Sequence, residues 1–253
     1  MNMEACGLNR FFAPAQRERF FHAVARRRSV RTYTADPDVG QMSALNYAAA
    51  RVCLPGVRIV LGEAPAALLY RHLPFVTAIS GTSRYAAVIA NGQADPHAAI
   101  HAGISGEALV LEATALGVGT CWVMAFKRKS VDIPLQAGEK VLAVIALGRF
   151  ENRDESARKR KKLTEICAED PSPWPLWAYN AAECVRQAPS ALNRQPWRLS
   201  FSGRTLLLTQ TGGCDLDMGI ALLHLSLGLE QRPHEIRWET GKNIASILSE
   251  DRI

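Results

Sequence analysis

The sequence predicts a layered α+β fold, and three observations indicate it. Residues 85–90 and 141–147 are continuous apolar runs of the length of a buried strand. Residues 96–116 predict a helix buried on nearly all sides, because almost every non-polar position is Ala, Ile, Leu or Val. Residues 197–201 and 205–209 alternate around a Ser-Gly pair, which is typical of a β-hairpin. Helices mixed with strands in this way pack as layers.

The other elements of the first part follow in chain order. Residues 16–28 predict an amphipathic helix, and the alanine-rich residues 41–53 predict a second one. A short strand is expected at 58–62, where a glycine ends it. Gly117-Val118-Gly119 ends the buried helix, and residues 120–123 continue directly from it as a strand.

The second part begins with a connecting segment. Residues 149–176 are polar, then basic, then rich in proline, which predicts a crossing between two halves of the chain. A helix is expected at 175–187, and an apolar helix at 216–229 with Asp215 as its N-cap. The expected end of the chain is an exposed strand at 235–239 and a short helix at 244–248.

Composition and charge narrow the class of protein. The 253 residues suffice for one large domain or two small ones, and 48% are hydrophobic, as in globular proteins. No segment approaches the roughly 18 consecutive apolar residues that span a bilayer, and no secretory signal is evident, so we expect no membrane partner. The net charge of +6 is concentrated in basic runs without interleaved aromatic residues, which argues against nucleic acid as a partner.

The cysteines and histidines predict neither disulfides nor a metal site. Six scattered cysteines include no CxxC pair, which indicates free thiols in the reducing cytoplasm. His97 and His101 have the spacing of metal ligands but no evident third ligand, so a solvent-facing pair is expected. Cys121 has no evident histidine partner and is expected to be a small buried thiol rather than a nucleophile.

Three segments carry possible binding chemistry. Residues 27–31 (RRSVR) offer guanidinium groups and a hydroxyl for a phosphate, or form a basic helix end that complements the helix dipole. The loop 188–197 offers Ser190, Asn193 and Gln195 as donors and acceptors for the edge of a planar heterocycle, or is a self-satisfied turn. The glycines of 117–123 let the backbone approach a ligand closely, or simply cap a helix that runs into a strand.

Together these segments resemble a known family. RRSVR, GEALVLEATALGVGTCW, RKRKKLTEI, APSALNRQPWRL and LDMGIALLHLSL are similar to the nitroreductase-like FMN-dependent oxidoreductases, specifically their "putative TM nitroreductase" branch. The resemblance runs from about Phe20 to Trp238. It implies a nitroreductase-like layered fold, with central, mostly antiparallel sheets flanked by helices.

The resemblance also implies which residues bind FMN. In the first motif Arg27 and Ser29 are expected on the phosphate side and Arg31 at the pyrimidine edge, and Arg28 is also expected to bind the cofactor. The late basic motif is expected to hold the phosphate as well. The remaining expected contacts are Arg158 and Arg160 to the phosphate, Ser190, Asn193 and Gln195 to the isoalloxazine, and Thr120, Cys121 and Trp122 along its N5 side.

The order of the motifs departs from the family pattern. Ordinary members carry RRSxR and PSxxNxQPW in one short stretch and complete each flavin site by pairing two chains. Here the second motif appears only after residue 188. We therefore expect a pseudo-dimer in one chain, with a first half at 16–170 and a degenerate second half at 171–253 completing one flavin site. The protein is then expected to be a monomer or a weak homo-oligomer.

The function implied by the resemblance is that of an FMN-dependent NAD(P)H oxidoreductase. Hydride passes from NADH or NADPH to the flavin N5 and then, in a ping-pong scheme, to a small planar electron acceptor such as a nitroaromatic or a quinone. No side chain is nominated as catalytic. The alternative is a non-catalytic flavin- or nucleotide-binding protein derived from that family.

Overall fold

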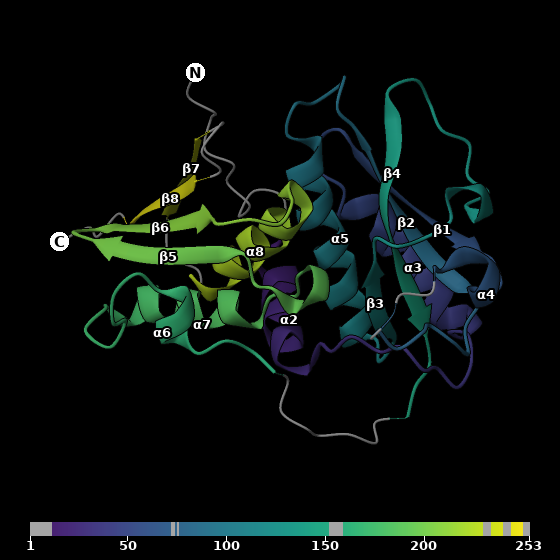
Figure 1. Ribbon diagram of the computed structural model, residues 1–253, viewed down its shortest axis with the longest axis horizontal. Coiled ribbons are helices and arrows are strands. Elements are labelled where there is room, and N and C mark those ends of the chain that lie inside the picture. The colour runs from purple at the N-terminus through teal and green to yellow at the C-terminus, as the bar shows by residue number, and fades with distance from the viewer. Residues whose placement is uncertain are drawn as a thin grey trace. The chain divides into compact units, whose positions relative to one another are not determined.

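The computed structural model (Figure 1) describes residues 12–71, 74, 76–151 and 159–229 in full, and the backbone of two C-terminal strands, His234–Glu239 and Ile244–Ser249. The chain forms two compact units. The continuous unit is Ala25–Arg158, and the split unit combines Met1–Val24 with Lys159–Ile253. These units differ from the expected halves 16–170 and 171–253, because the first helix and the residues from Lys159 onward pack with the C-terminal segment.

The continuous unit contains a four-stranded antiparallel sheet in the order β1-β2-β4-β3. The two central strands, β2 and β4, are the apolar runs of the sequence, and they are buried along nearly their whole length. A strand with neighbours on both edges and packing on both faces has few polar positions, so these runs read as continuous rather than alternating. The strands are β1 (Val57–Glu63), β2 (Arg84–Asn91), β3 (Gly119–Val123) and β4 (Glu139–Gly148).

Helices α5 (Ala98–Ala115) and α3 (Val39–Arg51) pack against this sheet and against each other. Helix α5 is buried on almost every side from Ala102 to Leu111, as its sequence predicts. Helix α3 begins with a capping box, in which Asp38 Oδ1 accepts from Gln41 N at 2.8 Å and Asp38 N donates to Gln41 Oε1 at 3.0 Å. Two short turns complete the unit: α4 (Ala66–Leu69) and the 3₁₀ helix η1 (Arg128–Ser130).

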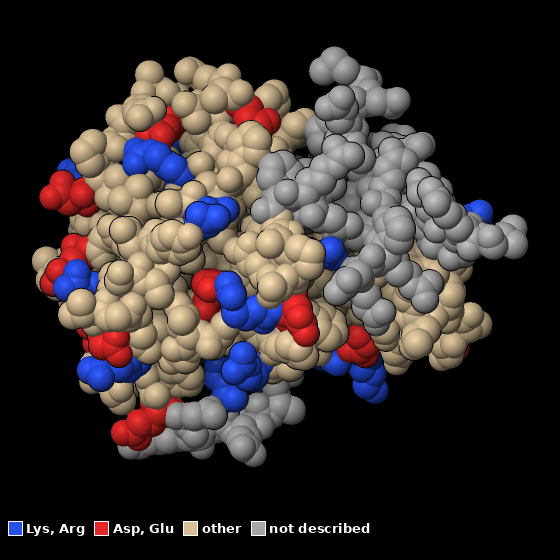
Figure 2. Space-filling view, turned by 180° about the vertical axis from the view of Figure 1, so that it is seen from behind, with Lys and Arg blue, Asp and Glu red and all other residues tan. Residues whose placement is uncertain are grey.

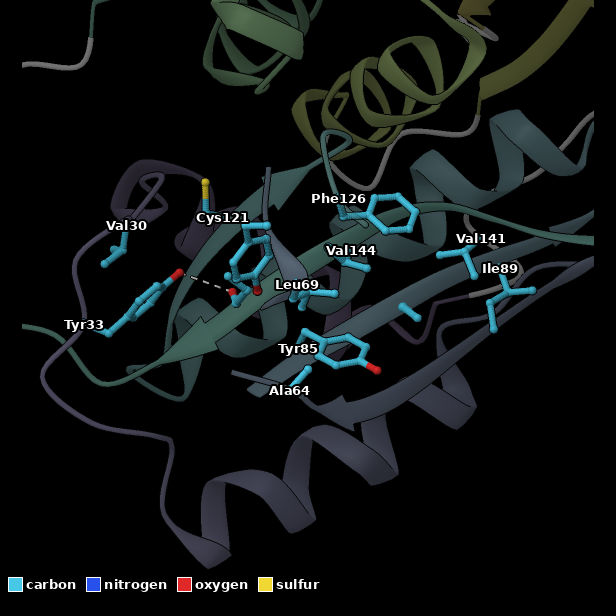
Figure 3. Close-up of a cluster of buried hydrophobic side chains, with 13 residues drawn as sticks. Val30, Tyr33, Ala64, Leu69, Tyr85, Ile89, Cys121, Phe126, Val141 and Val144 are labelled. Atoms are coloured by element: carbon cyan, nitrogen blue, oxygen red, sulfur yellow. Dashed lines mark hydrogen bonds between the residues drawn. The ribbon is translucent and has the colours of Figure 1, made fainter. Parts of the chain in front are cut away.

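A second layer of the continuous unit is an apolar cluster that includes residues of the N-terminal arm (Figure 3). Val30 and Tyr33 come from this arm, Tyr85 from β2, Cys121 from β3 and Phe126 from the loop after β3. The Tyr33 hydroxyl donates to the carbonyl of Ala146 on β4 at 3.4 Å. The arm that carries the RRSVR motif is therefore anchored in the core on both sides of Arg31.

The split unit has its own four-stranded antiparallel sheet, in the order β5-β6-β8-β7. The predicted hairpin is present, and its turn contains Gly203 with a φ of +60°. Helices α7 and α8 approach each other closely at Gly228, where an added Cβ would lie 2.7 Å from the Ala181 Cα. The elements are α2 (Pro14–Arg26), α6 (Leu163–Ile166), α7 (Leu176–Gln187), η2 (Ala191–Asn193), β5 (Trp197–Ser202), β6 (Thr205–Gln210), α8 (Asp215–Gly228), β7 (His234–Glu239) and β8 (Ile244–Ser249).

Two sequence predictions in the split unit are wrong. The expected terminal helix at 244–248 is strand β8, which pairs with both β6 and β7. A helix of so few residues is marginal, whereas a strand here satisfies the backbone groups of two neighbouring strands. The expected N-cap Asp215 is instead the first helical residue of α8, and Cys214 is the N-cap.

The crossing segment is more ordered than the sequence indicates. It contains α6, and Cys167 forms a parallel bridge with Leu199 of β5. Trp174 and Trp177 are buried against Phe201, with ring centroids 5.9 and 5.6 Å apart respectively. These contacts pack the end of the segment and the start of α7 against strand β5.

Candidate functional site

The continuous unit brings the first and third motifs together. Ser29 forms a parallel bridge with Thr120 of β3, and Val30 N donates to Thr120 O at 2.8 Å. The arm is extended here, so successive side chains alternate in direction. Val30 is buried in the core, whereas Ser29 is exposed and Arg31 is partly exposed. The hydroxyl of Ser29 and the guanidinium of Arg31 are thus presented away from the core, beside the GTCW segment.

Arg27 has a different environment from the other motif residues. Its side chain is 2% exposed, and its Nε lies 3.7 Å from Oε1 of Glu107, which is fully buried on α5. Burial lowers the pKa of Arg27, and the charges of Glu107 and Cys121 oppose that shift. An arginine nevertheless stays protonated in proteins, so Arg27 and Glu107 form a buried ion pair.

Glu107 also holds the indole of Trp122. Trp122 Nε1 donates to Glu107 Oε2 at 2.8 Å. The ring packs so closely on α5 that a Cβ added at Gly106 would lie 2.8 Å from Trp122 Cζ2. One carboxylate therefore links the first residue of the RRSVR motif to the last residue of GTCW.

Cys121 is buried and belongs to the apolar cluster (Figure 3). Burial raises the pKa of its thiol, although the positive charges of Arg31 and Arg27 act in the opposite direction. A thiol is a nucleophile only as the thiolate. Cys121 is therefore the small buried thiol that the sequence predicts.

The second motif forms an irregular loop in the split unit. Leu192, Asn193 and Gln195 have φ values of 52°, 54° and 50°, in the left-handed region. This conformation costs a non-glycine residue roughly 1–2 kcal/mol. Two bonds inside the unit support the loop: Gln195 N donates to Ser190 Oγ at 2.8 Å, and Ala191 N donates to Asp217 Oδ1 at 2.9 Å.

The basic segment lies against this loop. Arg160 donates to Asn193 Oδ1 and, at 3.3 Å, to the carbonyl of Gln187. Asn193 Nδ2 donates to the carbonyl of Lys159 at 2.8 Å, and Lys161 N donates to Gln195 Oε1 at 3.2 Å. The polar groups of the loop thus already have partners in the basic segment, as a self-satisfied turn has.

The predicted site residues therefore fall into two groups. The continuous unit holds Arg27, Arg28, Ser29, Arg31, Thr120, Cys121 and Trp122, and the split unit holds Arg160, Ser190, Asn193 and Gln195. Arg158 lies outside the described residues.

Sequence reasoning missed two buried carboxylates. Glu107 lies in the fully buried stretch of a mostly apolar helix, and a carboxylate there requires a partner, which is a signal that the sequence did contain. The other is Asp217 on α8, whose side chain is 2% exposed and accepts from the 190–195 loop.

The remaining histidines and surface charges bear on whether the chain could bind a metal or a membrane. Within the described part of the chain, no cluster of His, Cys, Asp and Glu could hold a metal ion. His101 was expected to face the solvent, but its side chain is only 12% exposed. Its Nδ1 lies 2.7 Å from Asp95 Oδ2. On the face shown in Figure 2, basic and acidic side chains are interspersed. None of the described helices is both long and apolar enough for a membrane span.

Comparison with solved structures relates this fold to nitroreductases. A "putative nitroreductase" of Thermotoga maritima superposes with a TM-score of 0.64 at 24% identity, covering 91% of this chain and 93% of that chain. A nitroreductase of Bacteroides fragilis with bound FMN gives a TM-score of 0.44 at 16% identity, covering 56% of this chain and 94% of that one. A nitroreductase family protein of Streptococcus pneumoniae gives 0.47 at 16% identity, covering 60% and 100%.

No curated protein matches the sequence. A family model described as "Putative TM nitroreductase" matches residues 19–229, which include all three motifs. The chain, with its RRSVR arm bridged to GTCW, therefore belongs to this nitroreductase family.

Proposed function

We propose that this protein is an FMN-dependent NAD(P)H oxidoreductase. The observation that carries the proposal is the bridge between Ser29 and Thr120, which sets the RRSVR arm beside GTCW in a chain of the nitroreductase family. The FMN bound to the Bacteroides fragilis nitroreductase supports the choice of cofactor. We also propose the cytoplasm as the compartment, as the sequence predicts.

The chemistry of the donors in the continuous unit fits a phosphorylated ligand whose ring becomes anionic on reduction. Ser29 offers an exposed hydroxyl, and Arg28 and Arg31 offer partly exposed guanidinium groups. Guanidinium groups bind phosphate and delocalised anions through charge-assisted hydrogen bonds. Arg27 is buried against Glu107, so we assign it an indirect role through its charge and its hold on the arm.

In the proposed mechanism the protein binds and orients while the cofactor supplies the redox chemistry, accepting a hydride from NADH or NADPH and passing electrons on. Ser29 and Arg28 would hold the phosphate side of FMN. Arg31 would place a positive charge near the part of the ring that becomes anionic on reduction. Thr120 and Trp122 would line the ring, and Glu107 keeps Trp122 in place. No side chain is required as a general base, so water can supply the proton.

The loop of the split unit is also proposed to contact flavin, as its motif predicts. Asn193 and Gln195 carry both donors and acceptors, which suit the alternating groups of the isoalloxazine edge. Their present partners are Arg160, Lys159 and Lys161. Flavin binding through this loop thus requires an exchange of hydrogen bonds.

A flavin titration tests the binding part of the proposal. The flavin-free chain is titrated with FMN, and binding is followed by quenching of flavin fluorescence. Arg31→Ala removes a charge-assisted contact worth about 1.5–3 kcal/mol, so we expect the Kd to rise by roughly 10-fold to 100-fold. Arg26→Ala is the matched control, because Arg26 is an exposed arginine at the end of α2, directly before the motif. Equal affinities for the two variants would contradict the assignment.

Anaerobic mixing with a nicotinamide separates the enzyme from a non-catalytic flavin-binding protein. The flavin-loaded chain is mixed with NADH and with NADPH in separate runs, and the oxidised-flavin absorbance is recorded over time. We expect rapid bleaching by at least one nicotinamide and recovery of the colour on adding a quinone or a nitroaromatic. If neither nicotinamide bleaches the flavin, the protein binds flavin without using it in this reaction.

A further inference from the structure

We propose that Asp217, near the start of α8, is the positioning residue that holds the 190–195 loop in the form that binds flavin. The inference rests on the proposed function, because it names a residue on which that function depends. In this proposal Asp217 does not itself contact the flavin. It acts through the backbone of Ala191, which lies in the motif loop.

The loop needs an external restraint. Three of its residues, Leu192, Asn193 and Gln195, lie in the left-handed region without being glycine. Such a conformation persists only where the surroundings over-determine it. The polar side chains of the loop depend on this backbone, because φ and ψ set the direction in which Asn193 and Gln195 leave the chain.

Asp217 supplies a restraint of the required kind. Its side chain is 2% exposed, and its Oδ1 accepts from Ala191 N at 2.9 Å. A buried carboxylate that accepts from a backbone N–H makes a charge-assisted bond, which is stronger than a bond between neutral groups. The bond joins helix α8, a rigid element, to the first residue of the 3₁₀ turn that bears the left-handed positions.

The turn before α8 allows the Asp217 carboxylate to lie close to the motif loop. Gly213 has a φ of +71°, and an added Cβ there would lie 2.8 Å from Asp217 Oδ2 and 2.6 Å from Pro196 Cγ. Cys214 Sγ donates to the same oxygen at 3.6 Å. The turn before α8 thus leaves room for one carboxylate between itself and the motif loop.

Asp215 provides an internal comparison. It is an acidic residue in the same first turn of α8, but its side chain is exposed. Both carboxylates stabilise the helix N-terminus through the helix dipole. A difference between variants at the two positions therefore does not come from the helix dipole, and the cleavage ratio at the loop reports the bond to Ala191.

The test uses the full chain without added flavin and then with FMN. Trypsin cuts after Arg194, which is exposed within the loop, and after Arg204, which is exposed in the β5–β6 turn and serves as an internal reference. We expect Asp217→Ala to raise the ratio of cleavage at Arg194 to cleavage at Arg204 several-fold, with Asp217→Asn between it and the wild type. Asp215→Ala is expected to keep the wild-type ratio.

The FMN titration on the same variants completes the test. We expect the Kd of Asp217→Ala to rise about tenfold or more, with partial recovery in Asp217→Asn because the amide oxygen still accepts from Ala191. If Asp217→Ala fails to fold, Asp217→Asn carries both measurements against Asp215→Asn.

Three outcomes would contradict either the role of Asp217 or the proposed function. A cleavage ratio that is unchanged in the Asp217 variants overturns the inference. Faster cleavage at Arg194 with unchanged FMN affinity also overturns it, since the loop would then be irrelevant to flavin. If the wild type itself binds no FMN, the proposed function fails, and the cleavage ratio alone still decides whether Asp217 holds the loop.

Discussion

The buried pair of Arg27 and Glu107 makes a quantitative prediction about stability. Glu107→Gln removes the negative charge but leaves an amide oxygen that accepts from Trp122 Nε1. The substitution therefore isolates the ion pair from the hydrogen bond. The two charged atoms are 3.7 Å apart, and both side chains are almost completely buried.

The magnitude follows from the geometry. At this separation and an effective dielectric constant of about 20, the attraction between unit charges is ~4 kcal/mol. The desolvation of Arg27, which already lowers its pKa, is not recovered when Glu107 is neutralised. Removing one partner of a buried pair typically costs about 3–5 kcal/mol. We therefore expect Glu107→Gln to lower the free energy of unfolding by ~3 kcal/mol.

Urea denaturation followed by far-UV circular dichroism measures this difference. Glu112→Gln is the matched control, because Glu112 is the other carboxylate of α5 and is only partly buried. The double variant Arg27→Met/Glu107→Gln is expected to recover part of the loss, because it leaves no uncompensated charge. A loss below ~1 kcal/mol for Glu107→Gln, or no difference from the control, would refute the reasoning.

Three further predictions concern packing, pH and thiol reactivity. Gly106→Ala drives a methyl group into the Trp122 ring and is expected to cost about 1–3 kcal/mol in urea denaturation, whereas a smaller effect means that the indole can shift freely. The hydrogen bond from Arg58 lowers the pKa of Glu139 from 4.5 to about 2, so its stabilisation is present above pH 4.5 and is lost as the pH falls toward 2. The gap in urea midpoint between wild type and Glu139→Gln should therefore narrow across that window, and a constant gap contradicts the coupling. Burial raises the pKa of Cys184 to about 12, so a thiol reagent at pH 8 is expected to modify it only after denaturation, as mass spectrometry of the peptides can check.

Several elements could be predicted because their local pattern agrees with their tertiary environment. Strands β2 and β4 are continuous apolar runs because they occupy the centre of a sheet. Helix α5 is mostly apolar because it is buried on nearly all sides. Strand β8 could not be predicted, because its state depends on hydrogen bonds to β6 and β7 rather than on its own residues.

The candidate site shows the same division. The residue types of RRSVR and of the 188–197 loop indicate an anionic, planar ligand, since guanidinium, hydroxyl and amide groups provide the required donors and acceptors. The environment of each side chain could not be predicted from the sequence. Arg27 and Arg31 belong to the same motif, yet the first is buried against Glu107 and the second is partly exposed.

The amino-acid sequence by itself determined the fold class, the main helices and strands, and the family to which the chain belongs, because these follow from local periodicity and short motifs. Only the tertiary structure decided which polar groups are partners. The contacts of Glu107 with Arg27 and Trp122, and of Asp217 with Ala191, join residues far apart in the chain. A buried charge requires a partner, so the sequence shows that a partner must exist. Which residue becomes the partner depends on how the helices and strands pack.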